Sequence, residues 1–295
     1  MLYHKTFELG PERDWVVFVH RAGGSSSIWF KQLRAYREHF NVLLLDLRGH
    51  GQSQAAAGDQ GPLQLSGGDR GYPATARSPQ HPPRPLRRHL LGTILIRHLA
   101  ELCPERVKSM VLGGAILRLD IRSRVLVQLG RLGQHILPYM WLYRLFAFII
   151  MPRQHHQESR NLFVREARKL CQRVQALVSP RHRGEPLMRY FKERALPIPT
   201  LYVMGEEDHM FLAPVREQVA RDPYSRLEII DGCGHVCNVE RPEHFNRQSL
   251  AFSPPSPAEL APAAALMRPW WLESARSCQV LAGNHRVLVH YYPAG

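Results

Sequence analysis

The sequence predicts an α/β fold, with a mostly parallel central sheet flanked by helices and a helical lid insertion. Short, continuously apolar runs alternate with helical patterns, which is typical of parallel strands covered on both faces. The chain has 295 residues, of which 44% are hydrophobic, so it is long enough to bury such a core. One long segment, residues 117–194, has helical patterns without a strand.

The first part of the sheet is predicted from two apolar runs. Residues 15–20 read WVVFVH and end at a Gly/Ser cluster, after which Trp29, Leu33 and Tyr36 repeat at helical spacing. Residues 41–47 read NVLLLDL and form the second predicted strand. Two such strands with a crossover helix make a right-handed βαβ unit.

Residues from about 54 to 90 interrupt this pattern. They are rich in Ala, Gly, Pro, Gln and Arg, with a period of neither 2 nor 3.6, and so long a structureless stretch is unusual inside a compact domain. A helical pattern follows at 91–102, and residues 107–112 (VKSMVL) are the next predicted strand. We therefore interpret residues 1–116 as the N-terminal part of one core that contains an aberrant segment.

The rest of the chain divides into an insertion, a second part of the core and a tail. Residues 117–194 are predicted to be packed helices, or a lid whose underside contacts substrate through Trp141 and Phe146. Residues 195–252 complete the core, with strands at 199–204 and 226–230 joined by a polar loop, and a helix at 242–252. Residues 253–295 show no clear element and are expected to be a tail, with disorder as one expectation.

Polar motifs follow the predicted strands. They read HRAGG at 20–24, DLRGHGQS at 46–53, GEED at 205–208 and GCGH at 232–235. A carboxylate after one parallel strand and a histidine after the next would meet at the carboxyl edge of the sheet. In these motifs the chain resembles the α/β-hydrolase superfamily, in its lidded esterase-like branch, over roughly residues 15–252.

The resemblance implies a role for each motif. It implies that Asp208 orients His235, which acts as general base and then as general acid. It also implies an oxyanion hole of backbone N–H groups, for which Ala22 and Leu91 are the candidates. Arg21 stands where the family usually has glycine, so a weakened oxyanion hole is expected.

The nucleophile is missing from its expected position. The family's nucleophile elbow reads G-x-S-x-G after a strand, whereas residues 88–92 read RHLLG, so that Leu90 occupies the serine position and no strand is predicted before it. Ser66 is rejected as a substitute, because no amphipathic helix follows it. Catalysis through a seryl intermediate is therefore expected to be abolished, leaving weak activation of water by His235.

A shifted reading frame explains these anomalies together. Residues 86–92 could be encoded CTT CGT CGG CAT CTC CTG GGC. If one C is added before CTG and the resulting sequence is translated from its second base, it encodes Phe-Val-Gly-Ile-Ser-Leu-Gly. That peptide is a strand followed by the elbow. Other codon choices give other peptides. The hypothesis is that residues from about 54 to 90 lie between two compensating insertions or deletions, and the tail has a similar origin.

Charge and cysteine usage define the expected partners. The net charge is +14, but the arginines are scattered and no nucleic-acid-binding motif occurs, so no nucleic acid partner is expected. The five cysteines are dispersed and odd in number, which argues against a disulfide framework. Cys233 and Cys237 flank His235, but no second ligand set accompanies them. We expect no metal and no cofactor.

Location and assembly are less constrained. The most apolar stretch, residues 136–151, contains Pro138 and Arg144 and is too short to span a bilayer, so no stable membrane insertion is expected. No secretory signal pattern is found at the N-terminus, which makes a cytoplasmic location the expectation. The sequence is silent on oligomeric state.

The sequence thus predicts an ancestral serine hydrolase that cleaves a carboxylic ester or similar acyl bond of a small apolar substrate, in a chain that lacks the serine. Two alternatives stay open. One is a non-catalytic pseudo-hydrolase that binds a small apolar ligand or a partner. The other is a relative of the epoxide hydrolases or haloalkane-type hydrolases, whose nucleophile is an aspartate.

Overall fold

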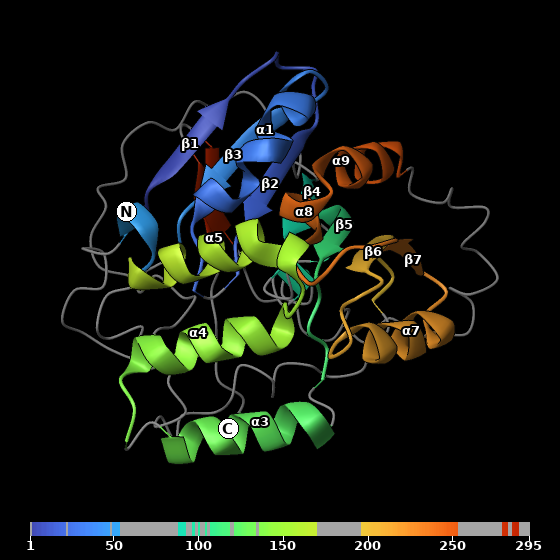
Figure 1. Cartoon of the computed structure of the whole chain (residues 1–295). Coiled ribbons are helices and arrows are strands. Elements are labelled where there is room, and N and C mark those ends of the chain that lie inside the picture. Colours follow the sequence, from blue (N-terminus) through green and yellow to red (C-terminus); the bar gives the residue numbers. More distant parts are fainter. Residues whose placement is uncertain are drawn as a thin grey trace, which may run out of the picture.

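A computed structural model gives the fold of the chain (Figure 1). It describes residues 2–21, 23–47, 49–53, 88–92, 96–97, 100, 104, 107–118, 121–133, 136–169, 196–252, 279–282 and 285–288. Its centre is a seven-stranded sheet with the order β1-β3-β2-β4-β5-β6-β7. All neighbouring strands are parallel except β1 and β3. The predicted α/β fold with a mostly parallel sheet is confirmed.

The inner strands are apolar because other elements cover both faces of the sheet. Every residue of β2 and of β6 is buried. The antiparallel edge strand β1 was not predicted from the sequence, because the exposed Lys5 and Thr6 hide its pattern. The strands are β1 His4–Phe7, β2 Trp15–Val19, β3 Asn41–Leu45, β4 Arg88–Gly92, β5 Val107–Gly113, β6 Thr200–Gly205 and β7 Ser225–Ile230.

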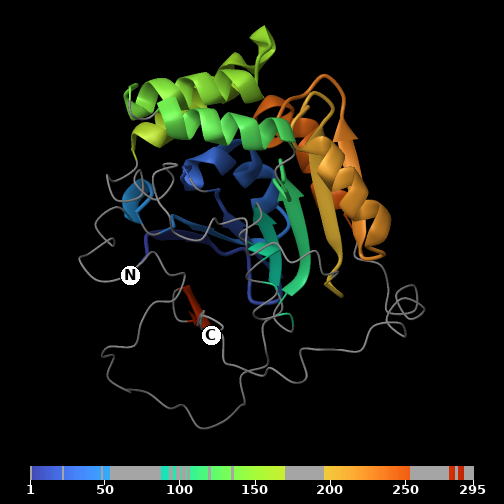
Figure 2. The same cartoon turned by 90° about the horizontal axis from the view of Figure 1, so that it is seen from below.

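Helices α1, α8 and α9 pack together, and α7 packs against β6 and β7. The sequence order places α3, α4 and α5 between β5 and β6. Figures 1 and 2 show these three helices gathered on one side of the molecule. The helices are α1 Phe30–Arg37, α3 Ile121–Gly133, α4 Tyr139–Ile150, α5 Gln157–Arg168, α7 Leu212–Arg221, α8 Cys237–Glu240 and α9 Pro242–Ala251, with short 3-10 helices η1 Ser26–Trp29, η2 Gly51–Ser53 and η5 Gln154–His156.

Strand β4 corrects the prediction for residues 88–92. These residues were aligned with the nucleophile elbow, but they form the strand between β2 and β5, where Leu90 pairs with Val17 and Met110. The sheet needs a strand between β2 and β5, and the apolar residues Leu90 and Leu91 suit that position. Leu91 and Gly92 belong to this strand rather than to the helix predicted from Leu91, and Ile96 and Arg97 are the next described residues, both helical. Residues 54–87 of the aberrant segment lie outside the described residues.

Two further predictions were wrong. The polar loop between β6 and β7 contains α7, whose apolar residues Leu212, Val215 and Val219 recur at helical spacing. Pro214 obscured this helix in the sequence, but it lies in the first turn, where proline is tolerated. In the tail, β8 Gln279–Ala282 and β9 His285–Leu288 pair antiparallel in a separate sheet. Residues 253–278 lie outside the described part of the chain.

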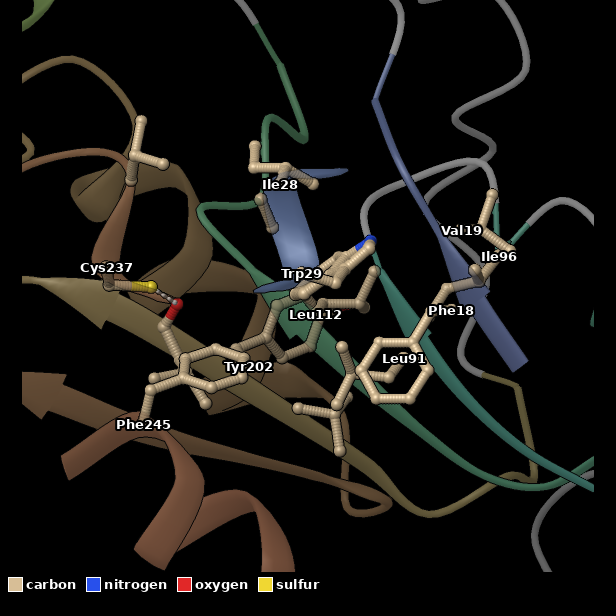
Figure 3. Close-up of a cluster of buried hydrophobic side chains, with 14 of the residues drawn as sticks. Phe18, Val19, Ile28, Trp29, Leu91, Ile96, Leu112, Tyr202, Cys237 and Phe245 are labelled. Atoms are coloured by element: carbon tan, nitrogen blue, oxygen red, sulfur yellow. Dashed lines mark hydrogen bonds between the residues drawn. The ribbon is translucent and has the colours of Figure 1, made fainter. Parts of the chain in front are cut away.

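The core joins the central strands to the helices packed against them (Figure 3). Phe18 of β2 contacts Trp29 and Tyr36 edge-on, with ring centroids 5.5 and 5.1 Å apart. Leu91 of β4 and Tyr202 of β6 are fully buried in the same cluster. This packing fixes the strand ends, and with them the loops that carry the polar motifs. Of the helices described, none is both long and apolar enough to cross a membrane.

Candidate active site

The acid and histidine motifs meet after β6 and β7. The Nδ1 atom of His235 donates a hydrogen bond to Oδ2 of Asp208 at 2.8 Å, and both side chains are buried. The second carboxylate oxygen, Oδ1, accepts the backbone N–H of Phe211 at 3.3 Å. A carboxylate on Nδ1 fixes the tautomer in which Nε2 carries the lone pair. This arrangement presents Nε2 as a base.

Glycines allow the histidine loop to approach the sheet closely. Gly114, directly after β5, has φ +56°, and a Cβ atom there would overlap the carbonyl oxygen of His235. A Cβ atom on Gly205, at the end of β6, would overlap the carbonyl oxygens of Cys233 and Gly234. Side chains at these two positions would displace His235 from Asp208.

The loop after β2 is hydrogen bonded to the turn after β3. Asp46 accepts the backbone N–H groups of Ser26 and Gln52 at 2.7 and 2.8 Å. The backbone N–H of Gly23 donates to Nε2 of His50 at 3.0 Å. The DLRGHGQS motif therefore has a structural role here: it fixes the loop that would carry the oxyanion hole.

His20 joins the same two segments from the end of β2. Its Nδ1 donates to the carbonyl oxygen of Arg21 at 2.8 Å, and its Nε2 accepts the backbone N–H of Leu47 at 2.9 Å. Burial lowers the pKa of His20 to about 4; the hydrogen bond to the carbonyl oxygen of Arg21 partly offsets burial, and the neighbouring His50 contributes a smaller lowering. The ring is neutral at pH 7, as these two hydrogen bonds require.

Arg21 occupies the space beside this loop. Its guanidinium lies over the ring of Phe163 in α5, 3.8 Å from the centroid, and Tyr143 of α4 stacks on the same ring at 4.7 Å. Burial lowers the pKa of Arg21 to about 10. Its Nε atom has no hydrogen-bond partner among the described residues. The bulky side chain that replaces the family's glycine thus fills space between β2 and the inserted helices.

The other predicted site residues are placed as follows. Ala22 lies outside the described residues. Leu90 and Leu91 lie within β4 rather than in a turn after it, and the side chain of Leu91 belongs to the core, so this placement does not support an oxyanion role for Leu91. Trp141 is 64% exposed, on the face of α4 opposite Tyr143, and Phe146 is partly buried against the core.

Sequence reasoning missed the residues by which the insertion contacts the site. Tyr143 lies beside Gly23, since a Cβ atom on that glycine would be 2.9 Å from its hydroxyl. Buried Glu166 of α5 accepts a hydrogen bond from Ser25 at 2.5 Å and one from Lys169 at 2.8 Å. Burial raises the pKa of Glu166, but these bonds outweigh it and lower the pKa overall. Such contacts join segments far apart in sequence and leave no periodic signal.

The two cysteines beside His235 point into the core. The thiol of Cys237 donates to the carbonyl oxygen of Val203 at 3.3 Å, and that of Cys233 to Gly234 at 3.6 Å. Burial raises the pKa of Cys237 to about 12 and raises that of Cys233 as well. Both thiols are therefore protonated at neutral pH, and neither is a reactive thiolate.

The fold and the site together define a class: an α/β protein with a buried carboxylate–histidine pair at the carboxyl edge of its sheet. Residues 16–248 match the profile of the alpha/beta hydrolase family. The chain belongs to that family.

Relatives that resemble the chain are hydrolases by name. It is 29% identical over 123 residues to (E)-2-((N-methylformamido)methylene)succinate hydrolase of Acinetobacter baylyi, a match that covers 41% of this chain and 45% of that protein. It is 26% identical to RutD of Cronobacter sakazakii, to which carbamate hydrolysis is provisionally assigned, over 86% of this chain and 94% of RutD.

A solved structure, that of a hydrolase from Oleispira antarctica, has the same fold. Its TM-score is 0.62 at 14% identity, over 84% of this chain and 92% of the other.

Proposed function

We propose that the chain derives from a serine hydrolase that cleaves a carboxylic ester or similar acyl bond, and that its own activity is impaired because the serine is missing. The observation that supports this most directly is the buried 2.8 Å contact between His235 Nδ1 and Asp208 Oδ2. The relatives' names, which specify hydrolysis of an N-formyl compound and of carbamates, are consistent with an acyl substrate.

The proposed chemistry follows the serine-hydrolase scheme. With a serine at position 90, His235 Nε2 would accept the hydroxyl proton during attack and return it to the leaving group, while Asp208 stabilises the imidazolium. Backbone N–H groups of the loop after β2, with Ala22 as the candidate, would bind the oxyanion. The scheme needs no cofactor. Without the serine, His235 is left to activate water, which is far slower.

Helices α3, α4 and α5 are proposed as the lid over a small apolar substrate. Tyr143 and Phe163 support this role, because both pack beside the loop after β2. We retain the cytoplasm as the proposed location.

A pseudo-hydrolase is the second candidate function. The continuous seven-stranded sheet favours it. This sheet is complete even though residues 88–92 lack the serine of the elbow motif. A cooperative thermal transition, together with saturable binding of an apolar ester without turnover, supports this candidate. A broad, non-cooperative transition supports damage by the frame shift instead.

The experiment that tests the primary proposal begins with independent sequencing of the gene across codons 50–95. One base that restores Gly-x-Ser-x-Gly supports the frame shift, and an intact frame encoding these same residues contradicts the frame shift and leaves the pseudo-hydrolase as the candidate. The repaired protein is then compared with this chain on p-nitrophenyl esters. We expect the repaired protein to be at least ~10³-fold more active, and its His235→Ala variant to lose that gain.

A further inference from the structure

A second group of polar side chains lies beside the acid–histidine pair and takes no part in it. His155 and His156 come from η5, just before α5, and Glu207 directly precedes Asp208. The Nε2 atoms of the two histidines each lie 2.9 Å from Oε2 of Glu207. Glu240, in α8, places its Oε2 3.6 Å from Nε2 of His156.

The two 2.9 Å distances are a few tenths of an ångström shorter than the spacing of metal ligands. At a metal–ligand distance of about 2.0–2.1 Å, two donors of a tetrahedral Zn²⁺ site lie about 3.3–3.4 Å apart. The donor atoms of His155, His156 and Glu207 all lie within 4.8 Å of one another. A cation at their centre would require only small movements of these side-chain ends. Glu240 lies outside this group of three, and its Oε2, 3.6 Å from His156 Nε2, would move closer to serve as the fourth ligand.

Burial and charge favour a cation at this position. The His156 and Glu240 side chains are 0% and 4% exposed, and Oε1 of Glu240 has no hydrogen-bond partner among the described residues. Arg153 pairs with Oε1 of Glu207, which leaves Oε2 directed at the two imidazoles. An outer partner of this kind commonly orients a ligating carboxylate.

The surroundings hold the donors in place and leave a route for entry. The ring of His156 packs against Gly234, where a Cβ atom would be 2.8 Å from Nε2. The backbone N–H of Gly234 donates to Oε2 of Glu240 at 2.6 Å. His155, in contrast, is 47% exposed, so a cation can reach the site from solvent.

We propose that His155, His156 and Glu207, with Glu240 as the fourth ligand, bind a borderline transition-metal cation of the Zn²⁺ type. Imidazole and carboxylate together are a donor set that suits Zn²⁺. The bound ion would join the start of α5 to the loops that carry Asp208 and His235. It is therefore a structural link between the proposed lid and the catalytic loops, not a reactant in hydrolysis.

The test measures metal binding directly, so that its outcome is independent of any activity. The metal-free protein is titrated with Co²⁺, whose visible absorption reports coordination number, and with Zn²⁺ by calorimetry and thermal unfolding. We expect one tetrahedral Co²⁺ per chain and a higher Tm in Zn²⁺. His155→Ala, at the exposed ligand, is expected to weaken Zn²⁺ binding about 100-fold without unfolding the protein.

A matched control comes from another histidine–glutamate pair. Nε2 of His244 lies 2.9 Å from Glu228, at the same spacing but with no third donor in the group. His244→Ala should leave metal affinity unchanged, and Glu240→Gln should lower it and alter the Co²⁺ spectrum. Absence of a tetrahedral Co²⁺ spectrum, or equal loss of Zn²⁺ binding in His155→Ala and His244→Ala, would overturn the proposal.

Discussion

At the scale of single residues, the site depends on positions where the backbone leaves no room for a side chain. Gly114 is the clearest of them, because its φ is +56° and a Cβ atom would overlap the carbonyl of His235. Gly114→Ala is therefore expected to destabilise the protein by about 1–3 kcal/mol and to weaken the His235–Asp208 contact. Urea unfolding measures the first effect.

Gly10 is the matched control for that substitution. A Cβ atom at this position meets nothing within 4 Å, so Gly10→Ala is expected to change stability by less than ~0.5 kcal/mol. Equal free energies of unfolding for the two variants would show that Gly114 is not under the constraint described.

His20 gives the protein a pH dependence whose sign is fixed by its burial. The folded-state pKa is about 4, below the ordinary value of 6.5, so the unfolded state binds more protons between these values. Stability from this residue is complete above pH 6.5 and is lost as the pH falls towards 4. Between pH 6.5 and 5 the expected loss is ~2 kcal/mol.

Urea unfolding at several pH values checks this prediction. His20→Gln keeps a polar side chain that does not titrate, so its stability should fall less steeply over the same range. Parallel pH profiles for the two proteins would assign the acid sensitivity to other groups.

Among single residues, Asp208 and His235 could be predicted because each follows an apolar strand in a recognisable motif. Their 2.8 Å contact followed from the parallel order of the strands. The cation–π contact of Arg21 with Phe163 could not be predicted, because 3D packing alone brings these residues together. The adjacent pair His155 and His156 was a visible signal in the sequence, but its partner Glu207 belongs to a distant loop.

At the scale of elements, the parallel strands were predictable and β4 was not. Continuous apolar runs identified the inner strands to within one or two residues, because burial on both faces demands such runs. In residues 88–92 only two leucines show that apolar pattern. Because an elbow was expected there, the segment was predicted as a turn instead of a strand. The hairpin of β8 and β9 had a signal, the dipeptide Gly283-Asn284 between two short segments, which is typical of a tight hairpin turn.

Leucine substitutions test the assignment of β4. Leu91 is 1% exposed in the core, and Leu91→Ala is expected to cost about 2–5 kcal/mol. Leu132 on α3 is 69% exposed, and Leu132→Ala is expected to change stability by less than ~0.5 kcal/mol. Chemical denaturation compares them. A small effect of Leu91→Ala would mean that residues 88–92 are an exposed turn rather than a central strand.

At the scale of the whole molecule, length and apolar content predicted a single α/β core, and the seven-stranded sheet agrees with that prediction. Composition could not locate the contacts between the inserted helices and the sheet, because these depend on which faces meet in space. Glu166 to Ser25 and His156 to Glu207 are two such contacts, and both fix α5 near the loops that follow β2 and β6.

The central claim is that this chain holds the acid and the base of a hydrolase without the nucleophile. Labelling by a fluorophosphonate, which reacts with activated serines, tests it most directly when adducts are counted by intact mass. The account predicts no adduct on this chain, and one adduct, dependent on His235, when residues 86–92 read Phe-Val-Gly-Ile-Ser-Leu-Gly. One adduct per molecule on the chain as it stands, lost in His235→Ala, would contradict the account.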